Sequence, residues 1–138
     1  MVGYYTESNY ENAVLQLLNE GLGYTYVYGP DVERDYHSPL YVDVLLPALQ
    51  RINPRLPIEA LNEAVYKLKT FETGTLLQKN MTFTDYMQSG VPVKYFVNGE
   101  ERSALVYLID FRSPANNDFT VVNQWTIVEN SEKRPDVI

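Results

Sequence analysis

The sequence predicts an α+β fold, in which a helical first half is followed by an antiparallel β-meander. Apolar residues recur at helical spacing as far as Ser89, and beyond it the pattern changes to the alternation and turn signals of strands. The chain has 138 residues, of which 45% are hydrophobic and 21% charged, as in an ordinary globular protein. Residues 1–138 are therefore expected to form a single domain with helices and strands segregated along the chain.

The first helix is expected to begin near Ser8. Ser8 and Glu11 have the spacing of a capping box, in which each side chain bonds the backbone N–H of the other residue. Apolar residues follow at helical spacing until Gly21 and Gly23 end the helix. The next residues, Tyr24–Tyr28, are typical of a short extended segment and are closed by a Gly-Pro break.

Three more helices are expected before the strands begin. Ser38-Pro39 opens the second, and Pro47 inside it predicts a kink or a division into two short helices. Pro57 lies near the first position of the third helix. A fourth helical region runs from Thr75 to Ser89, with a possible break near Asn80.

The second half of the chain predicts four strands in a meander. Val91–Val97 and Arg102–Phe111 flank Asn98-Gly99, which is the strongest short-range hairpin signal in the sequence. Phe119–Val128 is a third β-rich run. Pro135–Ile138 has the character of a strand that has just begun, so the chain is expected to be a piece of a longer protein.

Composition excludes several classes of function. With no cysteine, the chain can form neither disulfides nor thiolate metal sites, and a cytoplasmic location is expected. No apolar run is long enough to span a membrane. The single histidine, His37, lies in a polar loop and offers little material for zinc or Ser-His chemistry. A net charge of −7 argues against this chain gripping DNA phosphates by itself.

Asp136 and Glu11 are the candidate metal ligands. Asp136 follows a proline and is either an ordinary strand-start residue or a ligand, and a hard divalent cation needs several oxygens around it. Glu11 is the best internal partner, because it lies on the same helical face as the buried stripe, although the Ser8 capping box is the favoured explanation of it. A further polar cluster, interpreted as a turn followed by one buried amide, consists of Asn116, Asn117, Asp118 and Gln124.

A series of short motifs occurs along the chain in a fixed order. They are Thr-Glu-x-x-x-Glu before a Gly-Tyr, Ile-Asn-Pro-x-Leu-Pro, Gln78-Lys79-Asn80, Gly90-Val91-Pro92-Val93-x-Tyr95, Leu108-Ile109-Asp110-Phe111, Asn117-Asp118-Phe119-x-Val121-Val122-Asn123-Gln124, and Arg134-Pro135-Asp136-Val137-Ile138. In this order and over nearly the whole chain, the sequence resembles the N-terminal nuclease domain of the restriction (R) subunit of type I restriction–modification enzymes.

The resemblance implies a partial restriction-endonuclease-like core of the Pro-Asp … Glu-x-Lys type. Asp136 matches the motif aspartate, which would be catalytic and ligate Mg²⁺, and Glu11 matches the acidic position of the first core helix. Nothing matches the Glu-x-Lys pair or the ATP-driven motor, so the fragment alone is expected to be inactive. The intact subunit is expected to cleave double-stranded DNA after ATP-dependent translocation, in complex with modification and specificity subunits.

Two alternatives remain beside this interpretation. The first is a small acidic, non-enzymatic protein-interaction module that never binds metal, which the charge of −7 favours. The second is a related nuclease of the same core without a translocase. An unpaired terminal strand at Pro135–Ile138 also predicts a dimer formed by strand-edge pairing as a result of truncation.

Overall fold

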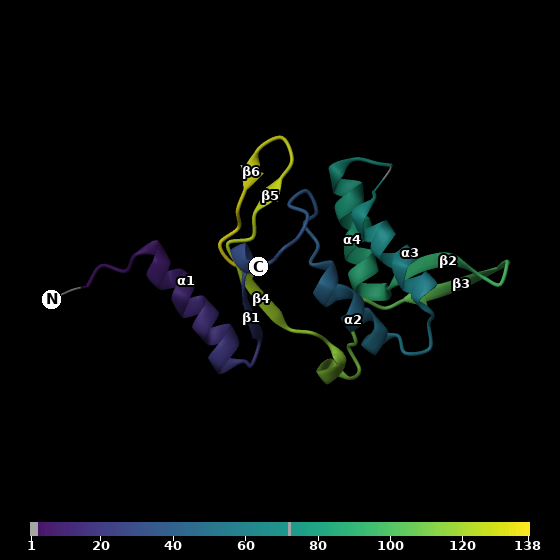
Figure 1. Ribbon diagram of the computed structural model, residues 1–138, viewed down its shortest axis with the longest axis horizontal. Coiled ribbons are helices and arrows are strands. Elements are labelled where there is room, and N and C mark those ends of the chain that lie inside the picture. Colours follow the sequence, from purple (N-terminus) through teal and green to yellow (C-terminus); the bar gives the residue numbers. More distant parts are fainter. Residues whose placement is uncertain (1–2, 72) are drawn as a thin grey trace. The chain divides into compact units, whose positions relative to one another are not determined.

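The computed structural model describes residues 3–71 and 73–138, which contain both helices and strands, consistent with an α+β fold (Figure 1). The chain divides into two compact units. Unit 1 joins the segment that ends at Pro39 to Phe119–Ile138, and unit 2 is Leu40–Asp118. The organisation of residues 1–138 as a single domain stays a prediction.

Each unit contains helices and a small sheet. Unit 1 holds α1 (Glu7–Gln16), the π-helical turn η1 (Leu17–Gly21), β1 (Thr25–Tyr28), the 3₁₀ turn η2 (Gly29–Asp31), β4 (Thr120–Asn123), β5 (Ile127–Val128) and β6 (Glu132–Lys133). Unit 2 holds α2 (Val42–Ile52), α3 (Ile58–Lys69), α4 (Leu76–Ser89), β2 (Val91–Val97), β3 (Glu100–Val106) and the 3₁₀ turn η3 (Pro114–Asn116). Helices thus precede strands in unit 2, as the hydrophobic spacing predicts.

The sheet of unit 1 is centred on β4. Strand β4 pairs in parallel with β1, in a register that runs from Thr25 opposite Thr120 to Tyr28 opposite Asn123 (Figure 1). Its other edge is bonded antiparallel to the last residues of the chain, where Val122 and Ile138 exchange two backbone hydrogen bonds of 2.9 and 2.8 Å. The expected antiparallel meander is therefore wrong for the third run. A parallel pair needs a long crossover connection, and here that connection is the whole of unit 2.

The terminal segment is consequently paired on one edge. Val137 forms an antiparallel bridge with Asn123, and the Gln124 N–H donates to the Asp136 carbonyl at 3.0 Å. The expectation of a wholly unpaired terminal strand is wrong, and strand-edge dimerisation finds no support. Strand β5 lies at the end of the predicted run Phe119–Val128, whereas β6, with which it forms a short antiparallel pair, was not expected from the sequence.

Trp125 holds three segments of unit 1 together. Its side chain has no exposed surface, its indole Nε1–H donates to the Pro39 carbonyl at 3.1 Å, and its backbone N–H donates to the Pro135 carbonyl at 3.1 Å. The guanidinium of Arg34 stacks 3.6 Å from the ring centroid and donates to the Thr126 carbonyl. Burial lowers the pKa of Arg34, and the neighbouring Tyr36 opposes part of this shift. A cation over an indole face is attracted by the ring quadrupole.

The core of unit 2 lies between its helices and the β2–β3 hairpin (Figure 1). Helix α3 supplies much of it, since its apolar positions recur every three or four residues and lie against β2. The buried residues of this cluster are Leu49, Ala60, Leu61, Ala64, Val65, Val91, Val93, Tyr95 and Val106. The hairpin turn has positive φ at both Asn98 (52°) and Gly99 (79°), as a type I′ turn requires, so this prediction is confirmed.

Two helices of unit 2 are more continuous than the sequence predicts. Helix α2 runs through Pro47 without a division. Helix α4 is unbroken at Asn80. It begins with a capping box formed by Thr75 and Gln78, which satisfies backbone donors at its start. The Thr84 hydroxyl also bonds back to the Asn80 carbonyl at 2.9 Å.

Polar side chains fix the residues that follow the hairpin. The buried Asn53 amide donates to the Leu49 and Tyr107 carbonyls at 3.0 and 2.8 Å, and accepts from the Tyr107 N–H at 2.9 Å. In the next turn, Asp110 accepts bonds from the N–H groups of Arg112 and Ser113 and from the Asn116 amide. These bonds, with that from Asn116 the largest cause, lower the pKa of Asp110.

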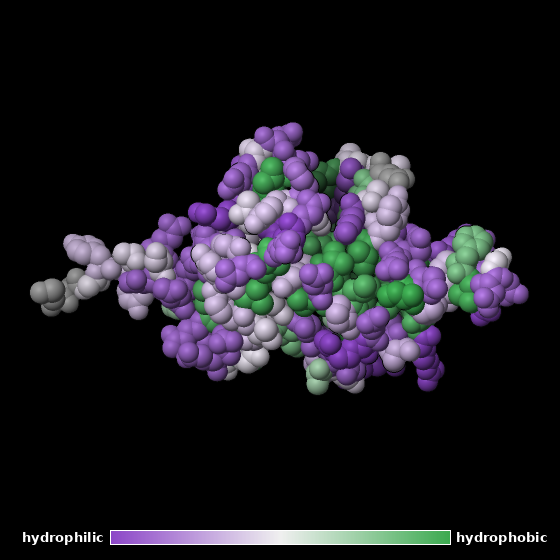
Figure 2. Space-filling model, in the orientation of Figure 1, coloured by the Kyte–Doolittle hydropathy of each residue, from purple (hydrophilic) through white to green (hydrophobic). Residues whose placement is uncertain are grey.

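Figure 2 shows hydrophobic residues at the surface of the part that holds α2 and the hairpin. Exposed apolar side chains of unit 2 include Leu76 and Leu77 of α4 and Phe96 of β2, with exposed fractions of 76%, 70% and 64%. Across residues 3–71 and 73–138, no helix combines the length and apolar character that a membrane crossing needs.

Gly29 is expected to be essential for the packing of unit 1. A Cβ at this position would lie 2.2 Å from the Asn123 carbonyl oxygen and 2.8 Å from that of Gln124, and backbone cannot move aside easily. Gly29→Ala should lower the free energy of unfolding by about 1–3 kcal/mol, the usual cost of overpacking. Urea unfolding followed by the fluorescence of Trp125 measures this, with Gly3→Ala as control, since nothing lies within 4 Å of a Cβ at Gly3. Equal midpoints for both variants would contradict this account of Gly29.

The hydrogen bonds to Asp110 predict a pH-dependent contribution to stability. Because the folded-state pKa of Asp110 lies below its unfolded value, the contribution is complete above the unfolded pKa of about 3.9 and is lost as pH falls through the folded pKa. Asp110→Asn should therefore be less stable than the parent at neutral pH, and this difference should shrink in acid. Urea midpoints between neutral and acidic pH test it, with Asp85→Asn as the control for loss of one charge. A difference that grows on acidification would refute the prediction.

Candidate functional site

Parallel pairing brings polar residues together at one edge of the unit 1 sheet. Strands β1 and β4 end at Tyr28 and Asn123, which lie opposite each other in register. The carboxyl ends of parallel strands meet at the same edge of a sheet, where functional side chains commonly gather. The antiparallel terminal segment returns past this edge and places Asp136 beside Gln124, whose backbone N–H donates to the Asp136 carbonyl.

A carboxamide lies between two carboxylates at this edge. The Gln124 Nε2 donates to both oxygens of Glu11, each at 3.1 Å, and to the Asp136 Oδ1 at 3.2 Å. The Asn123 Nδ2 donates to the Glu11 Oε1 at 3.0 Å, and the Tyr26 hydroxyl donates to the Asn123 Oδ1 at 3.0 Å. Residues from α1, β1, the end of β4 and the terminal segment therefore form one polar cluster, which we call the Gln124 cluster.

The cluster combines burial with access to solvent. Asn123 is buried, with 6% of its surface exposed, whereas Glu11 and Gln124 are half-buried and Asp136 is exposed. The backbone of Gln124 has φ of 51°, in the left-handed region that non-glycine residues rarely adopt and that costs roughly 1–3 kcal/mol. Such conformations persist where the surrounding structure imposes them, and they occur frequently at functional sites.

Glu11 does not have the partner that its sequence spacing favours. The N-cap of α1 is Thr6, whose hydroxyl accepts a hydrogen bond from the Asn9 N–H. The prediction of a capping box between Ser8 and Glu11 is therefore wrong. Helix α1 begins at Glu7, which leaves Ser8 inside its first turn. The Glu11 carboxylate is thereby free to contact Asn123 and the following amide from the other end of the chain.

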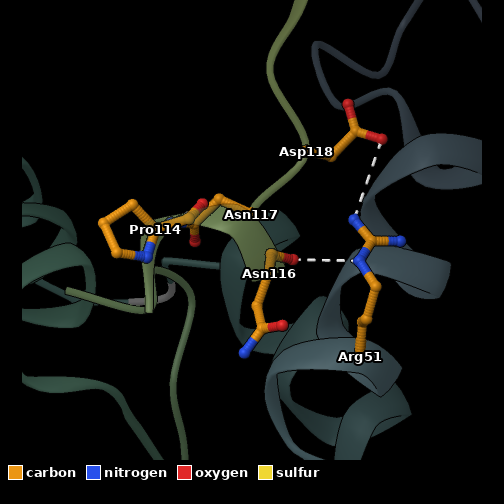
Figure 3. Close-up of polar contacts among 5 residues, drawn as sticks. All are labelled: Arg51, Pro114, Asn116, Asn117 and Asp118. Atoms are coloured by element: carbon orange, nitrogen blue, oxygen red, sulfur yellow. Dashed lines mark hydrogen bonds and ion pairs between the residues drawn. The ribbon is translucent and has the colours of Figure 1, made fainter. Parts of the chain in front are cut away.

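The predicted polar cluster of four residues divides between the two units. Asn117 and Asn116 close the turn around Asp110, and the Asn117 amide donates to the Pro114 carbonyl at 3.1 Å. Figure 3 shows Arg51 of α2 beside this turn: its Nε donates to the Asn116 carbonyl at 2.9 Å, and its guanidinium lies 3.9 Å from the Asp118 carboxylate. These contacts are structural, as the interpretation as a turn predicts. Gln124 alone belongs to the cluster of unit 1.

Sequence reasoning named Glu11 and Asp136 but missed what joins them. The roles of Asn123, Gln124 and Tyr26 depend on residues about a hundred positions away, which no local pattern reports. The available signal was the run of two amides after an apolar strand, Val121-Val122-Asn123-Gln124. His37 is exposed, as expected, and its Nδ1 also lies 2.8 Å from the Val128 carbonyl.

The donor atoms of the Gln124 cluster suit a hard cation. Two carboxylates and two carboxamides offer only oxygen ligands, and Mg²⁺ is commonly held by one or two carboxylates with water completing the shell. Among the residues that the structure describes, no group of three or more His, Cys, Asp or Glu side chains could hold a metal ion. In the described ranges, the cluster therefore offers part of a coordination shell, with Glu11 and Asp136 as its charged members.

Comparison with known proteins gives a consistent result. The family model of the type I restriction enzyme R protein N terminus matches residues 4–138. The type I restriction enzyme HindI endonuclease subunit of Haemophilus influenzae is 33% identical over 142 residues, which cover 96% of this chain and 13% of that protein. A Methanocaldococcus jannaschii protein, inferred to be the type I restriction enzyme MjaIXP endonuclease subunit, is 33% identical over 139 residues, covering 93% and 13%.

The aligned region thus covers nearly all of this chain but only a small part of each relative. The chain spans about 13% of the length of the two curated proteins. No solved structure matches it. Because the family model covers residues 4–138 and both relatives align over almost the whole chain, the chain belongs to the family of type I restriction enzyme R protein N termini.

Proposed function

We propose that this chain is the N-terminal part of the nuclease domain of a type I restriction subunit. The intact protein would cleave double-stranded DNA with Mg²⁺ after ATP-driven translocation, in complex with modification and specificity subunits. The observation that supports this most is the convergence of Glu11 and Asp136 on the Gln124 amide, in a chain of this family. A core of the Pro-Asp … Glu-x-Lys type, within a single domain, belongs to the same proposal.

The two carboxylates have separate roles in this proposal. Asp136 is the catalytic metal ligand, placed at the exposed side of the cluster where a DNA phosphate can approach. Glu11 is a second, more enclosed ligand, whose position is fixed by the amides of Asn123 and Gln124. The Mg²⁺ supplies Lewis-acid stabilisation of the phosphate and lowers the pKa of bound water. A Glu-x-Lys pair from another part of the intact protein completes the site, so this chain alone neither holds Mg²⁺ tightly nor cuts DNA.

The distribution of charge supports a cation site in unit 1. Residues 40–118 carry eight Lys and Arg against nine Asp and Glu, whereas the remainder of the chain carries three against nine. The excess of negative charge therefore lies in the unit that holds Glu11 and Asp136. Such a surface attracts divalent cations and repels phosphates, so DNA is held mainly by other parts of the intact subunit, and ATP by its motor domains.

Asp136→Ala, introduced into the complete restriction subunit that carries this sequence, should abolish DNA cleavage and leave ATP hydrolysis unchanged. We expect cleavage to fall by more than about a hundredfold, since even residues that only orient metal ligands cost 10–100-fold. The assay follows conversion of supercoiled plasmid to linear DNA in the reconstituted enzyme, with ATPase activity measured in the same samples.

Glu132→Ala is the matched control, because it removes one exposed carboxylate of unit 1 that lies in β6 and outside the Gln124 cluster. Parental cleavage by the Asp136 variant would refute its role. If the complete protein also failed to cleave DNA at any Mg²⁺ concentration, the acidic protein-interaction module would become the better description.

A further inference from the structure

The Gln124 amide contacts both of the carboxylates that a cation at this site would neutralise. Its Nε2 lies 3.1 Å from each oxygen of Glu11 and 3.2 Å from the Asp136 Oδ1. Within the described part of the chain, neither carboxylate forms an ion pair with a Lys, Arg or His side chain. The NH₂ group of Gln124 is therefore the side-chain donor that the two carboxylates share.

We propose that Gln124 is a two-position element of the metal site, an inference that rests on the proposed function. In the metal-free protein its NH₂ group bridges Glu11 and Asp136. In the metal-loaded protein the carboxamide is turned by half a rotation, so that Oε1 replaces Nε2 and becomes a ligand. Gln124 thus both keeps the two carboxylates assembled before the cation arrives and adds to the coordination shell afterwards.

Size and chemistry make the two positions mutually exclusive. Carboxylate oxygens that share one amide nitrogen can lie up to roughly 6 Å apart, twice a hydrogen-bond length. Two oxygens on one Mg²⁺ lie at most about 4 Å apart, because each Mg–O distance is close to 2.0–2.1 Å. A cation bound by both Glu11 and Asp136 would therefore draw their oxygens closer together. The hydrogens of an NH₂ group beside it would point at a positive charge, whereas Oε1 would present a lone pair to it.

The backbone of Gln124 is fixed while its terminal amide can rotate. Its φ of 51° is maintained by the hydrogen bond of its N–H to the Asp136 carbonyl, and by the buried side chain of Trp125, the next residue. The terminal torsion of a glutamine is broad and roughly two-fold, so a half-turn exchanges nitrogen for oxygen at nearly the same point. The change needs no movement of β4, and the amide oxygen is an accepted ligand of hard cations.

Two substitutions separate the two roles. Gln124→Leu removes both, so the metal-free protein should melt at a lower temperature and bind Mg²⁺ about tenfold more weakly. Gln124→Glu removes only the bridging donor and keeps an oxygen ligand. It should also melt at a lower temperature without metal, because three carboxylates repel one another, yet bind Mg²⁺ at least as tightly as the parent. A purely structural role for Gln124 would not produce this opposite effect on the two measurements.

The measurements are thermal unfolding of the chain without divalent cation and Mg²⁺ titration followed by NMR chemical shifts, which report weak binding. Gln50→Glu is the control, since Gln50 is an exposed glutamine of α2. If both Gln124 variants keep the parental melting temperature and affinity, or if Gln124→Glu weakens binding as Gln124→Leu does, the two-position model is wrong.

The same titration separates this inference from the proposed function. Binding that is lost in Asp136→Ala but unchanged in both Gln124 variants would refute only the role of Gln124. A parent chain whose spectrum does not respond to Mg²⁺ would refute the two-position model, whereas the metal site of the intact protein is tested separately by the cleavage assay of Asp136→Ala. A response that Asp136→Ala and Glu11→Ala both retain would place the bound cation elsewhere and have the same consequence.

Discussion

The structure of unit 1 depends on hydrogen bonding along both edges of β4. One edge of this four-residue strand is bonded in parallel to β1 and the other antiparallel to the terminal segment, so its backbone donors and acceptors find partners on each side. Because the strand cannot shift without losing both sets of bonds, the residues that follow it are held in place. Asn123, Gln124 and Trp125 therefore occupy fixed positions, and the carboxylates of α1 and of the terminal segment meet there.

Within this frame, burial and polarity alternate from one residue to the next. Trp125 is fully enclosed and stacked against Arg34, whereas Gln124 faces two carboxylates at the edge of the sheet. The approach of Gly29 to the carbonyls of Asn123 and Gln124 leaves no room for a side chain. A tightly packed backbone thus supports the polar cluster. This is the arrangement expected of a functional site, whose side chains are held in place by packing and by hydrogen bonds around them.

The sequence predicted the structural features that depend on neighbouring residues. It failed to predict those that depend on contacts between residues distant along the chain. The Asn98-Gly99 turn requires only local backbone geometry, and the hairpin is confirmed. The parallel pairing of β1 with β4 joins segments on either side of unit 2, and no local pattern specifies it. The Ser8–Glu11 spacing suggested a cap because distant amide partners for Glu11 are invisible in the sequence. Family motifs identified Asp136, whose role as a metal ligand stays a prediction. The sequence also named Gln124, as part of a polar cluster, but its contacts with Glu11 and Asp136 emerged only from the structure.

The division of the chain into units has a consequence for how the protein folds. Unit 2 is continuous in sequence, and its hairpin and helices can form soon after they are synthesised. Unit 1 is built from the two ends of the chain, so its contacts cross about a hundred residues and form only after a large loop is closed. During synthesis, α1 and β1 leave the ribosome first yet must wait for Thr120–Ile138. The polar cluster therefore forms only after both segments of unit 1 have been synthesised.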